Sequence, residues 1–230
     1  MNNYGQIGGY NVDVCLCIDK TGSMSPIINT VKRNALNLYD DITSALREKG
    51  KYISKFRVRV IWFGDYLADK EPMLISDFLT LPDDLDQFQK LVNGIKADGG
   101  GDEPEDGLEA LAYAIRSEWC ETGYGKRHII ALFTDAPAHE LGFGRKASTY
   151  PPSGMPKDFG ELSAMWGDEE DPGEMDYRSK RLLLFTPDVT FWHTISQNWE
   201  NTVMRPAAAA TGLKDVTYQA MLNTISNSIA

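Results

Sequence analysis

The sequence predicts an α/β fold with a doubly wound, mainly parallel central sheet and helices on both faces. Apolar strand-like segments alternate along the chain with segments of helical spacing, and this alternation is typical of linked strand-helix-strand units. The run HIIALFT at residues 128–134 is continuously apolar, as in strands that a parallel sheet buries on both faces. A length of 230 residues suits one α/β domain with its own core. We therefore expect a single domain over residues 1–230.

The first part of the chain opens with a strand, a turn and a helix. Residues 12–18 (VDVCLCI) predict a buried strand. The turn at 19–23 leads into a helix over 26–49, where apolar residues recur every three or four positions. A second strand is expected at 56–63, and residues 65–82 indicate a hairpin or an irregular excursion.

The middle of the chain adds two helices, the most apolar strand and a long polar segment. We expect a helix over residues 85–95 and another that opens at Pro104, before the strand at 128–134. Residues 142–173 are rich in Gly, Pro, Ser, Met and acidic residues. We interpret them as a loop insertion rather than a second core.

The last part of the chain completes the alternation. The run VTFWHTI at 189–195 predicts a strand, and a helix is expected over 198–210. A short strand at 215–217 and a closing helix over 218–229 follow.

Composition and charge exclude several classes of protein. The chain has 23 Lys and Arg against 33 Asp and Glu, for a net charge of −10, which is the wrong sign for binding nucleic acid or an anionic membrane. The longest apolar runs, at 129–133 and 182–185, are too short to cross a bilayer. The N-terminus lacks the basic start and apolar stretch of a secretory signal. We therefore expect a cytoplasmic protein with no membrane segment and a cationic ligand or metal.

The three cysteines do not indicate a disulfide framework. Cys15 and Cys17 lie two positions apart in the first predicted strand, so both side chains point to the same face. We interpret them as reduced core residues rather than a metal pair or a disulfide.

Three polar clusters follow or precede the predicted elements at positions where a parallel sheet binds ligands. Asp19, Thr21 and Ser23 come directly after the first strand, Asp102 follows three glycines in a loop before a helix, and Asp135 ends the most apolar strand. Carboxylate and hydroxyl oxygens without His or Cys suit a hard cation such as Mg²⁺, Mn²⁺ or Ca²⁺. Each cluster alone could serve as an ordinary cap or turn, but three of them together predict a divalent metal site.

These residues resemble the metal-ion-dependent adhesion site of von Willebrand factor type A domains. The resemblance rests on the pattern Asp19-x-Thr21-x-Ser23, the glycine-rich second loop, and Asp135 after Thr134, in the expected order. It implies a Rossmann-like fold in which Thr21 and Ser23 offer hydroxyl oxygens, Asp19 and Asp135 bind the metal directly or through water, and the second loop adds one ligand. Many members have threonine where this chain has Asp102. Some bacterial relatives, with a glycine run before Asp-x-Pro-Glu, are more similar.

The function that this resemblance implies is a divalent-metal-dependent protein-interaction module without catalysis. The partner would dock at the metal face, with an acidic side chain approaching the ion, although the extra carboxylate of Asp102 weakens that attraction. Cytoplasmic bacterial domains that look like this one often act as adaptors in stress-response or signalling complexes, of which the tellurium-resistance group is an example. The sequence has no G-x-x-x-x-G-K-[ST] loop and no G-x-S-x-G elbow.

The alternative function is a phosphotransferase or phosphatase of the haloacid-dehalogenase type. The stretch Asp19-Lys20-Thr21-Gly22-Ser23 is similar to the phosphorylation turn of P-type ATPases, in which the aspartate is the nucleophile and Mg²⁺ neutralises the charge. The acidic segment at 101–107 is a poor match to the later magnesium loop of those enzymes, and it precedes the third cluster.

Four further residues near these clusters have two interpretations each. Glu105 either reaches the metal or places favourable charge at a helix N-terminus. Lys20 is a contact near the ion or, as we prefer, a solvated turn lysine. His139 is interpreted as a partner-facing or helix-capping residue rather than a zinc ligand or base. Trp166, in the insertion, is expected to be exposed and available for contact.

Overall fold

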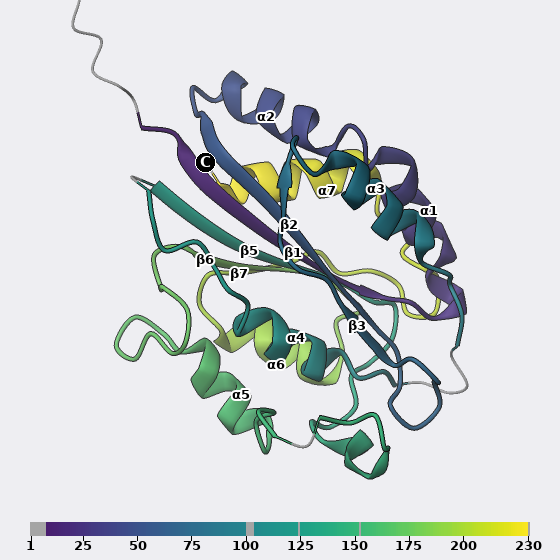
Figure 1. Cartoon of the computed structure of the whole chain (residues 1–230). Helices are drawn as coiled ribbons and strands as arrows, with labels where there is room; N and C mark the ends of the chain where they lie inside the picture. Colours follow the sequence, from purple (N-terminus) through teal and green to yellow (C-terminus); the bar gives the residue numbers. More distant parts are fainter. Residues whose placement is uncertain (1–7, 100–103, 124, 152, 230) are drawn as a thin grey trace, which may run out of the picture.

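The computed structural model describes residues 8–99, 104–123, 125–151 and 153–229. It confirms the α/β class, with a mainly parallel central sheet and helices packed on both of its faces (Figure 1). The loops at one edge of this sheet carry the candidate site. Three of the predicted site segments fall partly or wholly inside the described residues, and Asp102 lies outside them.

Within the described residues the sheet has seven strands; six follow the order β3-β2-β1-β5-β6-β7, and β4 pairs with β2 off this path. Strands β1, β2, β5, β6 and β7 are parallel, whereas β3 and β4 both pair antiparallel to β2. Their bounds are Tyr10–Asp19 (β1), Ile53–Phe63 (β2), Met73–Ile75 (β3), Leu79–Leu81 (β4), Gly125–Phe133 (β5), Lys180–Phe185 (β6) and Thr202–Met204 (β7). The excursion at 65–82 thus adds two short strands to β2 rather than a hairpin.

Strand register brings the carboxyl ends of the three central strands to one edge. Asp19 of β1 pairs with Phe63, the last residue of β2, and Ile18 pairs with Phe133, the last residue of β5. The loops that follow these strands therefore begin at the same end of the sheet, on the right-hand side of Figure 1.

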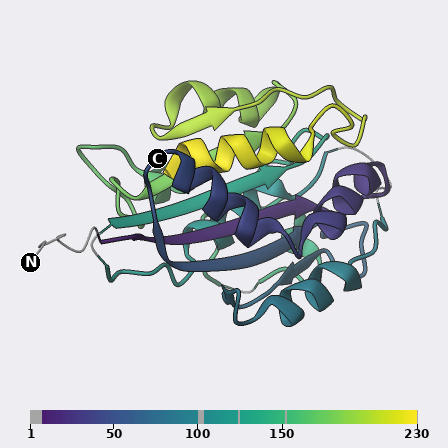
Figure 2. The same ribbon diagram turned by 90° about the horizontal axis from the view of Figure 1, so that it is seen from above.

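One face of the sheet is covered by α1, α2, α3 and α7, as both ribbon views show (Figures 1 and 2). Alternate residues of β1, including Val12, Leu16 and Ile18, pack toward this layer. The helices are Ser25–Asn34 (α1), Leu38–Glu48 (α2), Leu85–Gly94 (α3) and Tyr218–Ile229 (α7).

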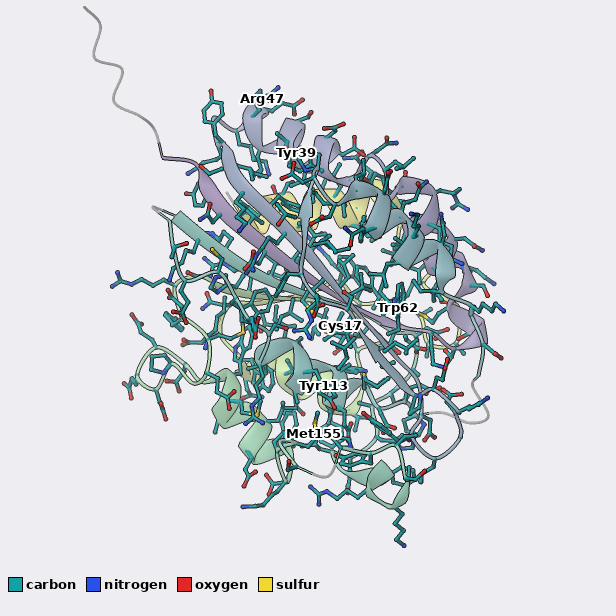
Figure 3. All side chains as sticks on the ribbon, in the orientation of Figure 1. Cys17, Tyr39, Arg47, Trp62, Tyr113 and Met155 are labelled. Carbon is teal, nitrogen blue, oxygen red and sulfur yellow. The ribbon has the colours of Figure 1, made fainter. Side chains whose placement is uncertain are left out.

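The other face is covered by α4 (Gly107–Ile115), α5 (Phe159–Trp166) and α6 (Thr190–Asn198). Cys15 and Cys17 point into this layer, with their sulfur atoms 3.9 Å apart and no disulfide between them. Figure 3 labels Cys17 on this side of the sheet and Tyr39 on the other.

The long helix predicted over residues 26–49 is wrong, because the chain breaks it into α1 and α2. Residues 35–37 form a turn between the two helices, in which the Asn37 backbone N–H donates to the Asn34 carbonyl at 3.0 Å. The Asn34 side chain donates to the Thr30 carbonyl at 2.7 Å. An asparagine side chain that competes for backbone groups disfavours a continuous helix. The prediction used only the spacing of apolar residues, which does not include this effect.

The strand predicted at 189–195 is also wrong, because these residues begin helix α6. Trp192, Ile195 and Trp199 are buried at helical spacing, so tertiary packing overrides the β propensity of the aromatic and β-branched residues. The fourth long parallel strand is instead β6. No strand was predicted over its sequence KRLLLF, of which residues 182–185 were considered only as an apolar run.

The remaining differences lie near the C-terminus and in the polar segment. Residues 198–210 contain strand β7 and a loop rather than a helix, and residues 215–217 form no strand. The segment 142–173 includes a short 3-10 helix, Phe143–Lys146, and helix α5. Trp166 is fully buried against the sheet rather than exposed, and its indole N–H donates to the Glu200 carbonyl at 2.9 Å.

None of the described helices is long and apolar enough to cross a membrane.

Candidate metal centre

The candidate site lies at the carboxyl ends of β1 and β5. Asp19 is the last residue of β1 and is fully buried. Asp135 stands two residues beyond the end of β5 and is also buried. The turn after Asp19 runs through a 3-10 helix, Gly22–Met24, into α1.

Hydrogen bonds join the predicted ligands into one network. The Thr21 hydroxyl donates to Asp19 Oδ1 at 2.6 Å, and the Ser23 hydroxyl donates to Asp135 Oδ1 at 2.9 Å. The two hydroxyl oxygens lie 3.4 Å apart. Four of the five predicted ligands therefore converge. The Thr134 hydroxyl joins them by donating to Asp19 Oδ2 at 2.7 Å.

The local sequence explains the shape of the first turn. Asp19 Oδ1 also accepts the Thr21 backbone N–H at 2.8 Å, which is an aspartate-stabilised turn. Met24 is fully buried and Pro26 lies in the first turn of α1, where its fixed backbone angle suits a helix start. These contacts hold the Thr21 and Ser23 hydroxyls toward Asp19 and Asp135.

A loop from near the C-terminus supports Asp135 and was not foreseen from the sequence. The Gly212 backbone N–H donates to Asp135 Oδ2 at 2.6 Å, and the Ala210 N–H donates to the Asp135 carbonyl at 2.9 Å. Gly212 has a φ of +64°, and a Cβ there would lie 1.9 Å from the Ser23 carbonyl oxygen. Only a glycine fits this position. A lone Thr-Gly pair after an alanine run carries no sequence signal for such a role.

The glycine-rich loop approaches the first turn from the other side. The Gly22 N–H donates to the Gly99 carbonyl at 3.3 Å, and the Asp98 N–H donates to the Lys20 carbonyl at 2.9 Å. Asp102, the ligand predicted from this loop, lies outside the described residues. Its role stays a prediction.

Glu105 does not stand in a helix, because α4 begins at Gly107. Its backbone is instead bonded to the segment after Asp135. The Glu105 N–H donates to the Pro137 carbonyl at 3.0 Å, and its carbonyl accepts from the His139 N–H at 2.9 Å. The side chain is only 3% exposed, and its Oε2 atom has no hydrogen-bond partner among the described residues. The prediction of a helix that opens at Pro104 and includes Glu105 is therefore wrong, since Glu105 precedes the N-cap residue Asp106.

The carboxylates of this edge are buried without cations of their own. Burial raises the pKa of Asp19 to about 6, against the opposing effect of the hydroxyl and backbone donors. Burial, followed by the charges of Asp19 and Asp69, raises the pKa of Glu105 to about 9. In the part of the chain that the structure describes, no lysine, arginine or histidine forms an ion pair with Asp19, Glu105 or Asp135.

The nearby basic residues are turned to other carboxylates. Lys20 is buried rather than solvated, and its Nζ atom lies 3.8 Å from Asp69 Oδ2. His139 is likewise buried rather than partner-facing, with Nε2 at 3.3 Å from Asp65 Oδ2 and its ring stacked on Phe143.

The donor set fits a hard divalent cation. Two carboxylates and two hydroxyls supply only oxygen atoms, the ligands that Mg²⁺, Mn²⁺ and Ca²⁺ prefer. Among the described residues no three His, Cys, Asp or Glu side chains lie close enough to hold a metal by themselves. The hydroxyls of Thr21 and Ser23 and the second loop are therefore needed to complete a site.

The geometry disfavours Asp19 as a phosphotransferase nucleophile. Its Oδ1 atom accepts two hydrogen bonds from Thr21 and its Oδ2 atom accepts one from Thr134. The residue is also fully buried. An attacking carboxylate needs an oxygen that the substrate can reach.

The sequence matches the family model described as von Willebrand factor A domain over residues 13–147, which is more than half of the chain. An alpha-protein kinase, vwkA, of Dictyostelium discoideum is 27% identical over 150 residues, which are 64% of this chain and 22% of that protein. An ariadne-like RING finger protein of Acanthamoeba polyphaga mimivirus is 27% identical over 136 residues, which are 58% of this chain and 12% of that protein. The chain thus spans less than a quarter of either relative.

Two solved structures resemble the fold at low sequence identity. The pilus adhesin SpaC from Lactobacillus rhamnosus GG has a TM-score of 0.51 and 14% identity, covering 96% of this chain and 30% of that chain. The PilB minor pilin from Streptococcus sanguinis has a TM-score of 0.55 and 12% identity, covering 97% of this chain and 63% of that chain. These similarities concern the fold.

Proposed function

Because this chain belongs to the von Willebrand factor A domain family, we propose that it is a protein-interaction module that binds its partner through a divalent cation held at the edge of the sheet. The observation that supports this most is the hydrogen-bonded network of Asp19, Thr21, Ser23 and Asp135. It gathers oxygen atoms from two strand ends, and its carboxylates have no cationic partner among the described residues.

Each residue has a distinct part in holding the cation, which is Mg²⁺ or, with similar ligands, Mn²⁺ or Ca²⁺. The hydroxyls of Thr21 and Ser23 and the carboxylates of Asp19 and Asp135 bind it directly or through water. Asp102 adds a carboxylate from the glycine-rich loop. When bound, the cation supplies the positive charge that attracts an acidic side chain of the partner.

We propose that Glu105 acts on the cation from beside the site rather than as a direct ligand, since no three acidic side chains of the described residues lie close enough to hold one metal ion. It comes from the glycine-rich loop, its carboxylate is buried with an unpartnered oxygen, and the Asp19 charge acts on it. A buried carboxylate needs a partner, and a cation beside Asp19 provides one.

The extra carboxylates weaken the pull on an acidic partner, so further contacts are needed. Leu67 and Phe143 are each about half exposed, on the loops after β2 and β5. These loops touch, since a Cβ on Gly144 would lie 2.5 Å from the Tyr66 Cβ. We infer that Leu67 and Phe143 contact apolar side chains of the partner beside the cation.

The cation is tested by thermal unfolding with and without Mg²⁺ or Mn²⁺. We expect the wild type to gain melting temperature with either ion, because a ligand that binds only the folded state stabilises it. Asp19→Ala and Asp135→Ala abolish this gain while the domain still folds. Asp84→Ala is the control, since Asp84 also caps a turn by accepting the Thr80 N–H at 2.8 Å. Its metal-induced gain is unchanged.

An unchanged gain in both Asp19→Ala and Asp135→Ala would place the ion elsewhere. An acyl phosphate adds no mass to Asp19 under the same conditions, since the fully buried carboxylate is out of reach of a substrate much larger than a metal ion.

The partner is tested by affinity capture with and without a chelator. We propose a signalling or stress-response complex in the cytoplasm, on the ground that one relative is a protein kinase and that Cys15 and Cys17 remain free thiols at 3.9 Å. A protein captured by the wild type with Mg²⁺, lost with chelator and lost with Asp135→Ala, supports the proposal. Capture that is indifferent to chelator contradicts it.

A further inference from the structure

Asp69 stands in the loop that follows β2 and is turned inward. Its backbone N–H donates to the Asp65 carbonyl at 2.8 Å, and its Oδ2 atom accepts the Asp65 N–H at 3.1 Å. The side chain is only 7% exposed. These two bonds form a closed turn that directs the carboxylate toward the sheet edge rather than into solvent.

The carboxylate occupies space that two glycines leave open. A Cβ on Gly64 would lie 2.0 Å from Asp69 Oδ2, and a Cβ on Gly99 would lie 2.2 Å from Asp69 Oδ1. Gly64 directly follows β2, and Gly99 belongs to the glycine-rich loop. Asp69 therefore fits in a slot between two segments that are far apart in sequence, and any side chain on either segment would displace it.

Lys20 connects the same carboxylate to the first metal-binding turn. Its Nζ atom lies 3.8 Å from Asp69 Oδ2, and its backbone carbonyl accepts the Asp98 N–H at 2.9 Å. Its own N–H donates to the Phe63 carbonyl at 2.8 Å. Through Lys20 and Gly99, Asp69 contacts both the Asp19–Ser23 turn and the described start of the glycine-rich loop.

We propose that Asp69 is a positioning residue that fixes the start of the glycine-rich loop, at Asp98 and Gly99, against the Asp19–Ser23 turn, and so keeps the Thr21 and Ser23 hydroxyls in place for the cation. This inference rests on the proposed function. We assign Asp69 a positioning role because its Oδ2 atom faces both the Lys20 ammonium and the Asp65 N–H. It acts by keeping the two loops in contact with each other and by holding the Lys20 ammonium away from the cation.

The steric fit allows a test that distinguishes a positioning role of Asp69 from a general loss of stability. We measure Mn²⁺ affinity by the electron paramagnetic resonance signal of free Mn²⁺ for Asp69→Ala, Gly64→Ala and the double variant. Removing a residue that orients metal ligands costs about tenfold to a hundredfold in affinity. We expect Asp69→Ala and Gly64→Ala each to weaken Mn²⁺ binding about tenfold, the second because its Cβ expels the Asp69 carboxylate.

The double variant separates positioning from an unspecific effect. If Gly64→Ala acts by displacing Asp69, it adds nothing once Asp69 is already alanine, and the double variant binds Mn²⁺ about as well as Asp69→Ala alone. Independent effects would instead multiply to about a hundredfold. The controls are Gly94→Ala, where a Cβ meets nothing within 4 Å, and Asp84→Ala, a turn aspartate on the loop after β4. Both keep wild-type affinity.

Three results are distinguishable. Wild-type affinity in Asp69→Ala, or multiplied losses in the double variant, overturns the role of Asp69. A wild-type protein that binds no Mn²⁺ overturns the proposed function itself. Non-additive losses with unchanged controls support the inference.

Discussion

Strand β1 carries a buried aspartate near each end, and the two are treated differently. Asp13, toward the amino end, accepts two hydrogen bonds from the Arg57 guanidinium at 2.8 and 2.6 Å and a third from the Cys120 N–H at 2.6 Å. Asp19, at the carboxyl end, accepts only hydroxyl and backbone donors. Both side chains are almost completely inaccessible to solvent.

This difference separates a structural carboxylate from a functional one. The charge of Asp13 is neutralised within the fold, whereas that of Asp19 is not neutralised by any described residue. A buried charge without a counter-ion is costly. The fold accepts that cost at the edge where parallel sheets bind ligands, which is why we assign the cation to Asp19 and not to Asp13.

The largest effect is expected at Asp13, the aspartate of β1 that is paired with Arg57. Arg57→Met leaves Asp13 buried without its counter-ion, which costs about 3–5 kcal/mol of the free energy of unfolding. Urea unfolding measures this loss, and Mg²⁺ changes the stability of the variant by the same amount as that of the wild type. Arg33→Met, at an exposed arginine of α1, is the control with little effect. A loss below about 1 kcal/mol for Arg57→Met would show that Asp13 does not depend on the pair.

The next effect concerns the loop near the C-terminus that supports Asp135 in the candidate site. Gly212→Val puts side-chain atoms against the Ser23 carbonyl, and such overpacking costs about 1–3 kcal/mol. It also displaces the N–H that holds Asp135, so Mn²⁺ affinity falls. Gly50→Val is matched to it, because Gly50 has a similar φ of +68° but open space around it. If both variants keep full Mn²⁺ affinity, the C-terminal loop does not position Asp135.

A smaller effect of opposite sign is expected at Glu105. In a chelator at neutral pH, Glu105→Gln raises the free energy of unfolding by about 1 kcal/mol, because a buried carboxyl that must take up a proton on folding is replaced by an amide that is neutral in both states. The same variant reduces the stabilisation that Mg²⁺ gives. Glu109→Gln is the contrast. Glu109 also has an unpartnered Oε2 atom, but its Oε1 atom accepts bonds from the Gly142 N–H and the Tyr150 hydroxyl, so we expect this variant to lose stability and keep the metal effect. A metal-free Glu105→Gln protein that is less stable than wild type contradicts this account.

The last effect, which shows only above about pH 8, concerns a buried cation rather than a buried anion. Lys180 donates to the carbonyls of Trp166, Gly167 and Pro172, and burial lowers its pKa from 10.5 to about 8. The unfolded chain therefore binds this proton more firmly than the folded one. Stability should rise between about pH 8 and pH 10.5 relative to Lys180→Met, because the cost of the buried ammonium disappears. A difference between the two proteins that does not change over this range would contradict the shift.

The sequence predicted most of the site because its signals are local. Asp19, Thr21 and Ser23 follow a strand at fixed spacing, and Asp135 ends another. The rule that parallel strands end at one edge brings them together. Gly212 and the true setting of Glu105 escaped prediction, because both depend on contacts between segments distant in sequence and neither has a pattern of its own.

The errors in the fold have a similar cause. The run VTFWHTI has the composition of a strand, but the packing of Trp192 and Ile195 against α4 and the sheet makes it a helix. The break after α1 coincides with Asn34, whose side chain bonds the Thr30 carbonyl, and the periodicity of the apolar residues takes no account of such a bond. Composition also placed Trp166 at the surface, whereas the aromatic stack with Trp199 buries it.

A titration with Mn²⁺, followed by electron paramagnetic resonance, tests the central claim most directly. The account predicts that the wild-type protein binds one Mn²⁺ ion, that Mg²⁺ displaces it, and that Asp135→Asn loses it while remaining folded. Absence of binding by the wild type, or equal binding by Asp135→Asn, would contradict the assignment of a divalent cation to the site formed by Asp19 and Asp135.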